Sequence, residues 1–127
     1  MSITVKALPE SGRWYVRKHR DCIFLFGDNL LQKGRGGQAA AMRGERNAIG
    51  IPTKKKPEMT EDSFFTDDEF EENKKAIDKA FSKIPKDATV IIPMAGLGTG
   101  RAQLRERAPR TYTYISDKIH ELMEQEK

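Results

Sequence analysis

Two glycine-rich segments carry the residues whose types and spacing suit the binding of an anionic ligand. The first begins with Gly27, Asp28, Asn29 and Lys33 and continues into a loop made of Gly34, Arg35, Gly36, Gly37 and Gln38. Glycines let the backbone approach a ligand closely, and the unpaired N–H groups at the start of a following helix receive phosphate well. The alternative is a tight strand-to-helix turn in which Asp28 or Asn29 caps the backbone locally. Because one turn does not need three glycines, we expect a binding loop.

The second segment repeats this composition over residues Gly96, Leu97, Gly98, Thr99, Gly100 and Arg101. It lacks the Gly-Lys-Ser/Thr ending of a Walker A loop, and its G-x-G-x-G spacing differs from the dinucleotide-binding fingerprint. The Thr99 hydroxyl suits a hydrogen bond to phosphate, and the backbone N–H groups suit an anion-binding nest. If both segments lie on one edge of a sheet, they predict two walls of one phosphate site.

Other kinds of catalytic chemistry find little support. The chain has two histidines and one cysteine, Cys22, which leads into an apolar run and is expected to be a buried, unreactive thiol. No spacing suggests a metal site, and no cofactor is predicted. The acidic run 67–72 reads as the first turn of a helix, where carboxylates favour the helix dipole.

The elements that must position the two segments alternate between strand and helix. We expect strands at 3–5, 14–16, 22–26, 48–51 and 88–94, and helices at 36–42, 66–83, 101–107 and beyond Pro109. This order predicts an α/β fold: a single domain over 1–127 with a mixed, largely parallel central sheet and helices on both faces. Ligands of such sheets bind at the carboxyl ends of the strands, where both glycine segments begin.

Several residues define the expected element boundaries. Gly44 suits the end of the short helix, and Pro52 is expected to end the strand at 48–51. Thr66 and Glu69 match a capping box at the start of the long helix. The last helix is expected to bury a stripe made of Ile115, Ile119, Leu122 and Met123.

Positive charge is concentrated in the first half of the chain. The net charge is +4, but residues 1–57 hold 12 Lys/Arg against 4 Asp/Glu, whereas residues 58–88 hold 5 against 10. This excess favours an anionic ligand, either a phosphorylated nucleotide or nucleic acid, although a solvated basic face explains it equally well. The chain contains no signal core and no apolar run long enough to span a membrane. We therefore expect a cytoplasmic protein with no membrane partner and an undetermined oligomeric state.

The order of these motifs resembles the macrodomain superfamily, in the compact macro-like form found in bacterial and phage proteins. Macrodomains carry a strand that ends in an Asn-bearing segment, here 23–29, followed by a glycine-rich loop and a helix. A short strand, a helix, and a buried strand that leads into a phosphate loop follow, here 48–51, 67–83 and 90–100. The resemblance covers roughly residues 22 to 125.

The resemblance implies that the chain binds ADP-ribose or a related phosphorylated nucleoside, free or attached to a macromolecule. The second segment would hold the diphosphate, and the first segment with Asn29 would face the distal ribose. Some family members hydrolyse ADP-ribosyl bonds and others only bind. In a hydrolase, Asp28 would act as base or ribose orienter, Asn29 would position the substrate, and Lys33 would stabilise charge. Arg35 stands where hydrolases acting on ADP-ribosylated DNA carry a reactive lysine, and arginine cannot form a Schiff base. The alternatives are a non-catalytic nucleotide sensor or a basic nucleic-acid-binding protein.

Overall fold

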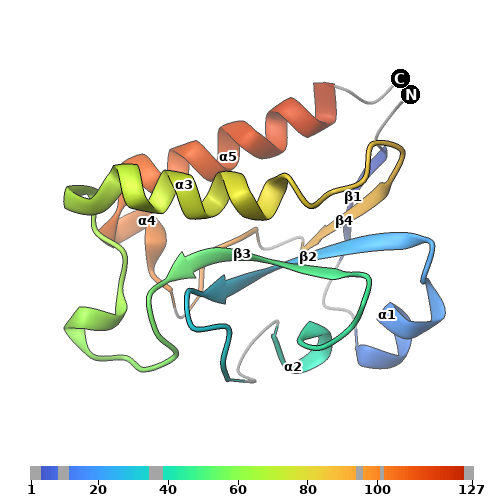
Figure 1. Cartoon of the computed structure of the whole chain (residues 1–127), viewed down its shortest axis with the longest axis horizontal. Coiled ribbons are helices and arrows are strands. Elements are labelled where there is room, and N and C mark those ends of the chain that lie inside the picture. The colour runs from blue at the N-terminus through green and yellow to red at the C-terminus, as the bar shows by residue number, and fades with distance from the viewer. Residues whose placement is uncertain (1–3, 9–11, 35–38, 94–95, 101, 125–127) are drawn as a thin grey trace.

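The chain forms a parallel sheet with helices on both faces (Figure 1). This computed structural model describes residues 4–8, 12–34, 39–93, 96–100 and 102–124. The strands β4, β2 and β3 lie side by side in that order, and β1 joins the outer edge of β4. The strands are β1 (Thr4–Leu8), β2 (Cys22–Asn29), β3 (Ala48–Lys54) and β4 (Thr89–Pro93). Every pairing between them is parallel, so within the described residues the sheet is all-parallel rather than mixed.

Helices cover the sheet on two sides. The described helices are α1 (Arg13–Lys18), α2 (Ala39–Met42), α3 (Phe70–Phe81), α4 (Leu104–Arg107) and α5 (Pro109–Glu124), with 3-10 turns η1 (Glu61–Ser63) and η2 (Asp67–Glu69). Figure 1 shows α3 and α5 above the sheet and α1 and α2 below it. The expected placement of helices on both faces is therefore confirmed.

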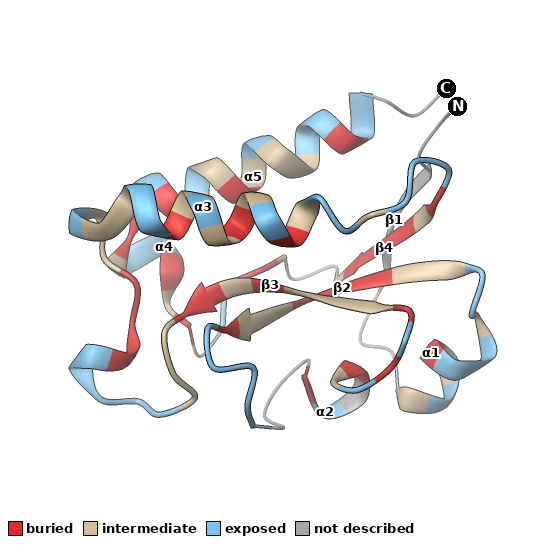
Figure 2. Ribbon diagram, in the orientation of Figure 1, coloured by how far each residue is buried: buried red, intermediate tan, exposed pale blue. Residues whose placement is uncertain are grey.

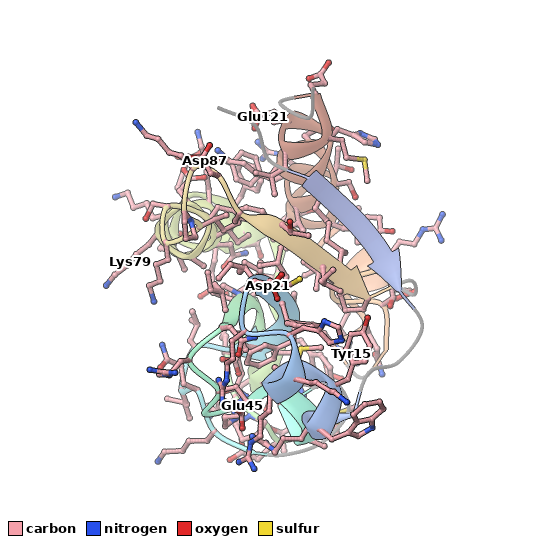
Figure 3. All side chains as sticks on the ribbon, turned by 90° about the vertical axis from the view of Figure 1, so that its right-hand side faces the viewer. Tyr15, Asp21, Glu45, Lys79, Asp87 and Glu121 are labelled. Carbon is pink, nitrogen blue, oxygen red and sulfur yellow. The ribbon has the colours of Figure 1, made fainter. Side chains whose placement is uncertain are left out.

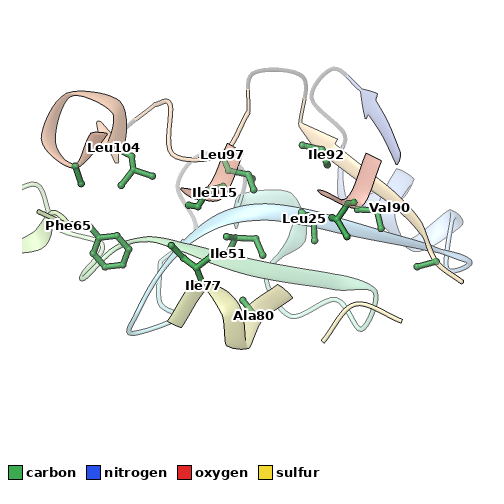
Figure 4. Close-up of a cluster of buried hydrophobic side chains, with 13 residues drawn as sticks. Leu25, Ile51, Phe65, Ile77, Ala80, Val90, Ile92, Leu97, Leu104 and Ile115 are labelled. Carbon is green, nitrogen blue, oxygen red and sulfur yellow. The ribbon is translucent and has the colours of Figure 1, made fainter. Parts of the chain in front are cut away.

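Alternating side chains of β2 supply both cores. Leu25 packs with Ile51, Val90, Ile77 and other residues in the larger core on the side of α3 and α5 (Figure 4). The two flanking phenylalanines, at positions 24 and 26, point to the smaller core with α1 and α2. This alternation follows from the two-residue period of a strand. Figure 2 shows the resulting buried interior along the strands and along the inner faces of α3 and α5.

The predicted strand at 14–16 is wrong, because these residues belong to helix α1. The β-forming types Trp, Tyr and Val favoured a strand locally, but only Val16 is buried and it docks one helical face on the smaller core. Tertiary packing has overridden the weak local preference.

Other predicted boundaries shift for identifiable reasons. Strand β3 continues through Pro52, which is tolerated because β3 is an edge strand of the described sheet. The Thr66 hydroxyl contacts the Glu69 carboxylate at 3.4 Å and makes no capping bond to the backbone, so the expected capping box does not form. Met123 is 43% exposed and lies outside the core, unlike Ile115 and Leu122.

Candidate functional site

The two glycine segments leave the same edge of the sheet. Strand β2 pairs with β3 on one side and with β4 on the other, and all three run parallel. Strand β2 runs beyond its predicted end at residue 26, so Gly27, Asp28 and Asn29 of the first segment form its carboxyl end and the rest of the segment follows it. The second segment follows the carboxyl end of β4. The two segments therefore leave the carboxyl ends of neighbouring strands, which is the condition under which the sequence predicts a shared site.

Thr53 on β3 lies in contact with both glycine segments. Its hydroxyl donates to the Asp28 carbonyl oxygen at 3.2 Å. Its methyl carbon lies 3.2 Å from the position that a Cβ would occupy on Gly98. Thr53 is buried, so it links the end of β2 to the second segment in the interior of the protein.

The Asp28 carboxylate is held by Arg43, which follows α2. Both terminal guanidinium nitrogens of Arg43 reach the carboxylate, one of them at 3.3 Å from Oδ2. The same guanidinium donates to the Gly34 carbonyl oxygen at 2.6 Å and to the Lys33 carbonyl oxygen at 3.2 Å. Arg43 thereby ties the end of β2 to the loop that follows it.

Gly50 on the neighbouring strand leaves room for this ion pair. A Cβ built on Gly50 would lie 2.5 Å from Oδ2 of Asp28, well inside contact distance. A glycine at this position therefore lets the carboxylate turn over β3 toward Arg43.

The side-chain amide of Asn29 is hydrogen-bonded to the backbone of the same loop. Its side-chain Nδ2 donates to the Lys33 carbonyl oxygen at 2.8 Å, and its Oδ1 accepts from the Lys33 N–H at 3.4 Å. Within the loop, Gln32 and Gly34 have positive φ values of 55° and 92°. Asn29 is buried, and its amide holds this tight backbone path in place.

The second segment is anchored on one side and exposed on the other. Leu97 packs in the larger core, and a Cβ on Gly98 would lie 2.9 Å from two side-chain carbons of Leu104. The Gly98 carbonyl oxygen accepts the Leu104 N–H at 3.0 Å, at the start of α4. Thr99 and Gly100 are exposed. The segment therefore contains two buried residues, Leu97 and Gly98, followed by two exposed residues, Thr99 and Gly100.

The structure describes part of the predicted site. It brings Gly27, Asp28, Asn29, Lys33 and Gly34 to one end of β2, and it places 96–100 after the neighbouring strand. Five predicted ligand-binding residues lie outside the described residues: Arg35, Gly36, Gly37, Gln38 and Arg101.

One cluster near this edge had no signal in the sequence. Lys54, at the end of β3, and Arg107, in α4, both lie over the ring of Phe64, at 4.8 Å and 3.7 Å from its centroid. Lys54 also donates from Nζ to the Glu58 carbonyl oxygen at 2.5 Å. The members of this cluster come from β3, α4 and the segment between β3 and α3, and only the tertiary fold brings them together.

A second unexpected cluster surrounds Glu45 below the sheet. Its buried carboxylate accepts hydrogen bonds from Arg13, Arg17 and Arg20 at 2.5, 3.1 and 3.1 Å. The hydrogen bond from Arg13 is the largest influence that lowers the pKa of Glu45 below 4.5, with Arg17 adding to it and burial opposing it. Arg13 and Arg17 are four residues apart and lie on one flank of α1, and Arg20 follows just beyond the end of this helix at Lys18. The four-residue spacing of the first two was the signal available in the sequence.

The described residues hold no group of three or more His, Cys, Asp and Glu side chains placed to bind a metal ion. None of the helices in the described ranges is both long enough and apolar enough to cross a membrane.

The fold and the edge just described define a small α/β domain with a parallel sheet and two glycine segments at its carboxyl edge. The chain belongs to a family of unknown function (DUF7831), whose model matches residues 10–118. No curated protein and no solved structure matches the chain.

Proposed function

We propose that the carboxyl edge of the sheet binds ADP-ribose or a related phosphorylated nucleoside between the two glycine segments, as in the macrodomains that the motif order resembles. The observation that carries the proposal is the adjacency of β2 and β4. Two glycine-rich segments that leave adjacent parallel strands lie where α/β proteins bind nucleotides.

The second segment supports a phosphate contact. Gly96 and Gly98 have positive φ values of 89° and 79° on either side of Leu97, and Thr99, which follows them, is exposed. Turns with alternating backbone conformation direct successive N–H groups to one side and form anion-binding concavities. The diphosphate is proposed to bind there, with the hydroxyl of Thr99 as a further donor.

The contacts of Asp28 and Asn29 support binding rather than hydrolysis. A general base needs a carboxylate oxygen that can reach a substrate proton. Both oxygens of Asp28 receive hydrogen bonds from Arg43, and the amide of Asn29 is bonded to the backbone of Lys33 at both ends. We assign these two side chains to shaping the loop, and we propose a module that senses or sequesters the nucleotide.

Thermal unfolding in the presence of nucleotides tests the proposal. A ligand at about one hundred times its Kd stabilises the folded state by about 2.7 kcal/mol, which raises the Tm of a domain of this size by about 10 °C. We expect this shift with ADP-ribose and a smaller one with inorganic phosphate. Unchanged Tm values with ADP-ribose, ADP and NAD would reject the proposal.

Incubation with ADP-ribosylated protein and ADP-ribosylated DNA separates binding from hydrolysis. We expect retention of the modification and no release of free ADP-ribose. Release that disappears in the Asp28→Asn variant would instead establish a hydrolase and restore the catalytic role of Asp28.

A further inference from the structure

Helix α1 presents a basic surface with an exposed tryptophan on the side of the molecule away from α3. Residues 12–20 contain four Lys/Arg and no Asp/Glu. Val16 points into the smaller core, so the opposite face of the helix carries Trp14 and Lys18, with Arg17 on the flank, and all three are exposed. Figure 3 looks onto this end of the molecule and shows Tyr15 and Glu45 in the same lower region.

The indole of Trp14 is held in place although it is exposed. Its side chain is 68% exposed, the largest fraction among the exposed large hydrophobic residues of the described chain. The ring lies against the backbone of Gly12, where an added Cβ would come within 3.0 Å of Cδ1. Tyr15 adds an edge-on contact with ring centroids 5.7 Å apart. A large aromatic surface with contacts to two neighbouring residues therefore faces solvent and is available for stacking.

The arginines next to this tryptophan carry more positive charge than their partner neutralises. Glu45 is one carboxylate among three guanidinium groups, which leaves an excess of two positive charges before Lys18 is counted. The side chain of Arg17 is 61% exposed, and Nε is its one hydrogen-bonded nitrogen within the described part of the chain. Glu45 therefore holds the guanidinium in position while leaving its outer nitrogens directed to solvent, a geometry that suits phosphate oxygens.

We propose that this surface, made of Trp14, Arg17, Lys18 and Arg20, binds single-stranded nucleic acid. The cations contact the phosphate backbone, and an unpaired base stacks on the indole of Trp14. A single strand fits better than a duplex because stacking requires an unpaired base. An anionic membrane fits less well because this face offers one large apolar side chain, whereas interfacial helices bury a broad apolar face. This surface is separate from the glycine segments, so the inference does not depend on the proposed nucleotide site.

The chain provides its own probe, because Trp14 is its single tryptophan. Addition of a twelve-nucleotide oligothymidylate to the full chain is expected to quench the tryptophan emission, since stacking places a base on the fluorophore. Contacts with about three phosphates predict a log–log salt slope of about −2, which is a loss of affinity of about twentyfold between 50 and 200 mM salt.

Matched variants locate the contact. Lys18→Glu is expected to weaken binding about tenfold at low salt and Trp14→Ala about fivefold or more, as measured by anisotropy of a labelled strand. Arg17→Gln, which adds no negative charge next to Glu45, is expected to weaken binding by a smaller factor. Lys79→Glu, on the exposed face of α3 and well apart from Tyr15 and Glu45 in Figure 3, is the control with the same charge change and should leave the affinity unchanged.

Three results would overturn the proposal. The first is an absence of quenching and of anisotropy change with the oligonucleotide at 50 mM salt. The second is equal losses in Lys18→Glu and Lys79→Glu. The third is tighter binding to a duplex of the same length, or to vesicles containing phosphatidylserine, than to the single strand.

Discussion

Asp28 marks the point where β2 passes into the glycine segment, and its partner Arg43 lies fifteen residues further along the chain. The side chains of the pair are 7% and 16% exposed. Removing one member of a buried pair leaves the other charge without compensation, so we expect Asp28→Ala to lower the free energy of unfolding by about 3 kcal/mol. Urea unfolding of both single variants and the double variant should give a coupling energy of about 2 kcal/mol.

The ion pair formed by Lys118 and Glu121 provides the control for this double-mutant cycle of Asp28 and Arg43. Its atoms are 3.9 Å apart and Glu121 is 61% exposed, so its coupling should stay below about 0.5 kcal/mol. Equal coupling in the two cycles would mean that the Asp28 ion pair does not hold the loop.

Glu45 makes stability depend on pH in a defined direction. Its folded pKa is lowered from 4.5, chiefly by the hydrogen bond from Arg13. A lowered carboxyl pKa contributes stability above the unfolded pKa, and this contribution is lost as the pH falls through the folded pKa. We expect Glu45→Gln to have a lower Tm than the parent chain at pH 7, and the difference to shrink below pH 4.5.

Thermal unfolding at pH 7, 5 and 3.5 measures this difference. Glu106→Gln, at an exposed position on α4, is the control and should follow the parent chain at every pH. A gap between Glu45→Gln and the parent that stays constant down to pH 3.5 would contradict the assignment.

At the scale of residues, the sequence identified Asp28 and Asn29 as important but not what they contact. The apolar run before them and the glycines after them predicted a strand that ends in a loop. The partner of Asp28 depends on where Arg43 comes to lie after folding, and no local pattern encodes that. The bonds between Asn29 and the backbone of Lys33 are the local capping that the sequence allowed as the alternative. The arginines around Glu45 escaped detection because the helix that aligns Arg13 and Arg17 was interpreted as a strand.

Among the secondary-structure elements, α5 is capped by a residue from another part of the chain. The Asp67 carboxylate accepts the backbone N–H groups of Arg110 and Thr111 at 3.1 and 3.3 Å. The sequence placed Asp67 in the first turn of the helix that follows it, whereas in the structure it lies in η2 before α3 and bonds to the start of α5. We expect Asp67→Ala to cost about 1 kcal/mol of unfolding free energy.

Asp68→Ala is the matched control, because Asp68 is exposed and adjacent in the chain. It should change stability by less than about 0.5 kcal/mol in the same urea titration. A larger loss for Asp68 than for Asp67 would contradict the cap.

Three glycines separate the effect of backbone conformation from the effect of packing. Gly100 has open space and no positive φ, Gly44 has open space and a φ of 90°, and Gly98 has both a φ of 79° and close contact with Leu104. Substitution by alanine should cost less than about 0.5 kcal/mol at Gly100, about 1 kcal/mol at Gly44 and about 3 kcal/mol at Gly98. Urea unfolding of the three variants measures the series, and a Gly98→Ala cost no greater than that of Gly44→Ala would show that the second segment is not packed on Leu104.

The secondary-structure elements were more predictable than their ends. The strong apolar runs at 22–26 and 89–92 and the periodic pattern in α3 and α5 correspond to the observed elements. Predicted boundaries were wrong where tertiary contacts decide them. Strand β3 passes through Pro52 because it lies on an edge, and α1 is a helix that buries Val16 in the smaller core with Tyr15 packed beside it.

At the scale of the whole molecule, the two sites that we propose lie on different elements around one parallel sheet. The nucleotide site is proposed at the carboxyl edge of β2 and β4, and the nucleic-acid surface is proposed on α1 below the sheet. The alternation of strands and helices predicted this layered arrangement, whereas the described pairings alone give the strand order and the uniformly parallel direction.

Titration calorimetry of ADP-ribose into the full chain and two threonine variants tests the central claim most directly. Thr99→Glu places a negative charge at the proposed phosphate site, and Thr113→Glu places the same charge at an exposed position on α5. The account predicts one-to-one binding to the parent chain and to Thr113→Glu, with at least about tenfold weaker binding to Thr99→Glu because like charges repel. Absence of binding to the parent chain, or equal affinity in all three proteins, would contradict it.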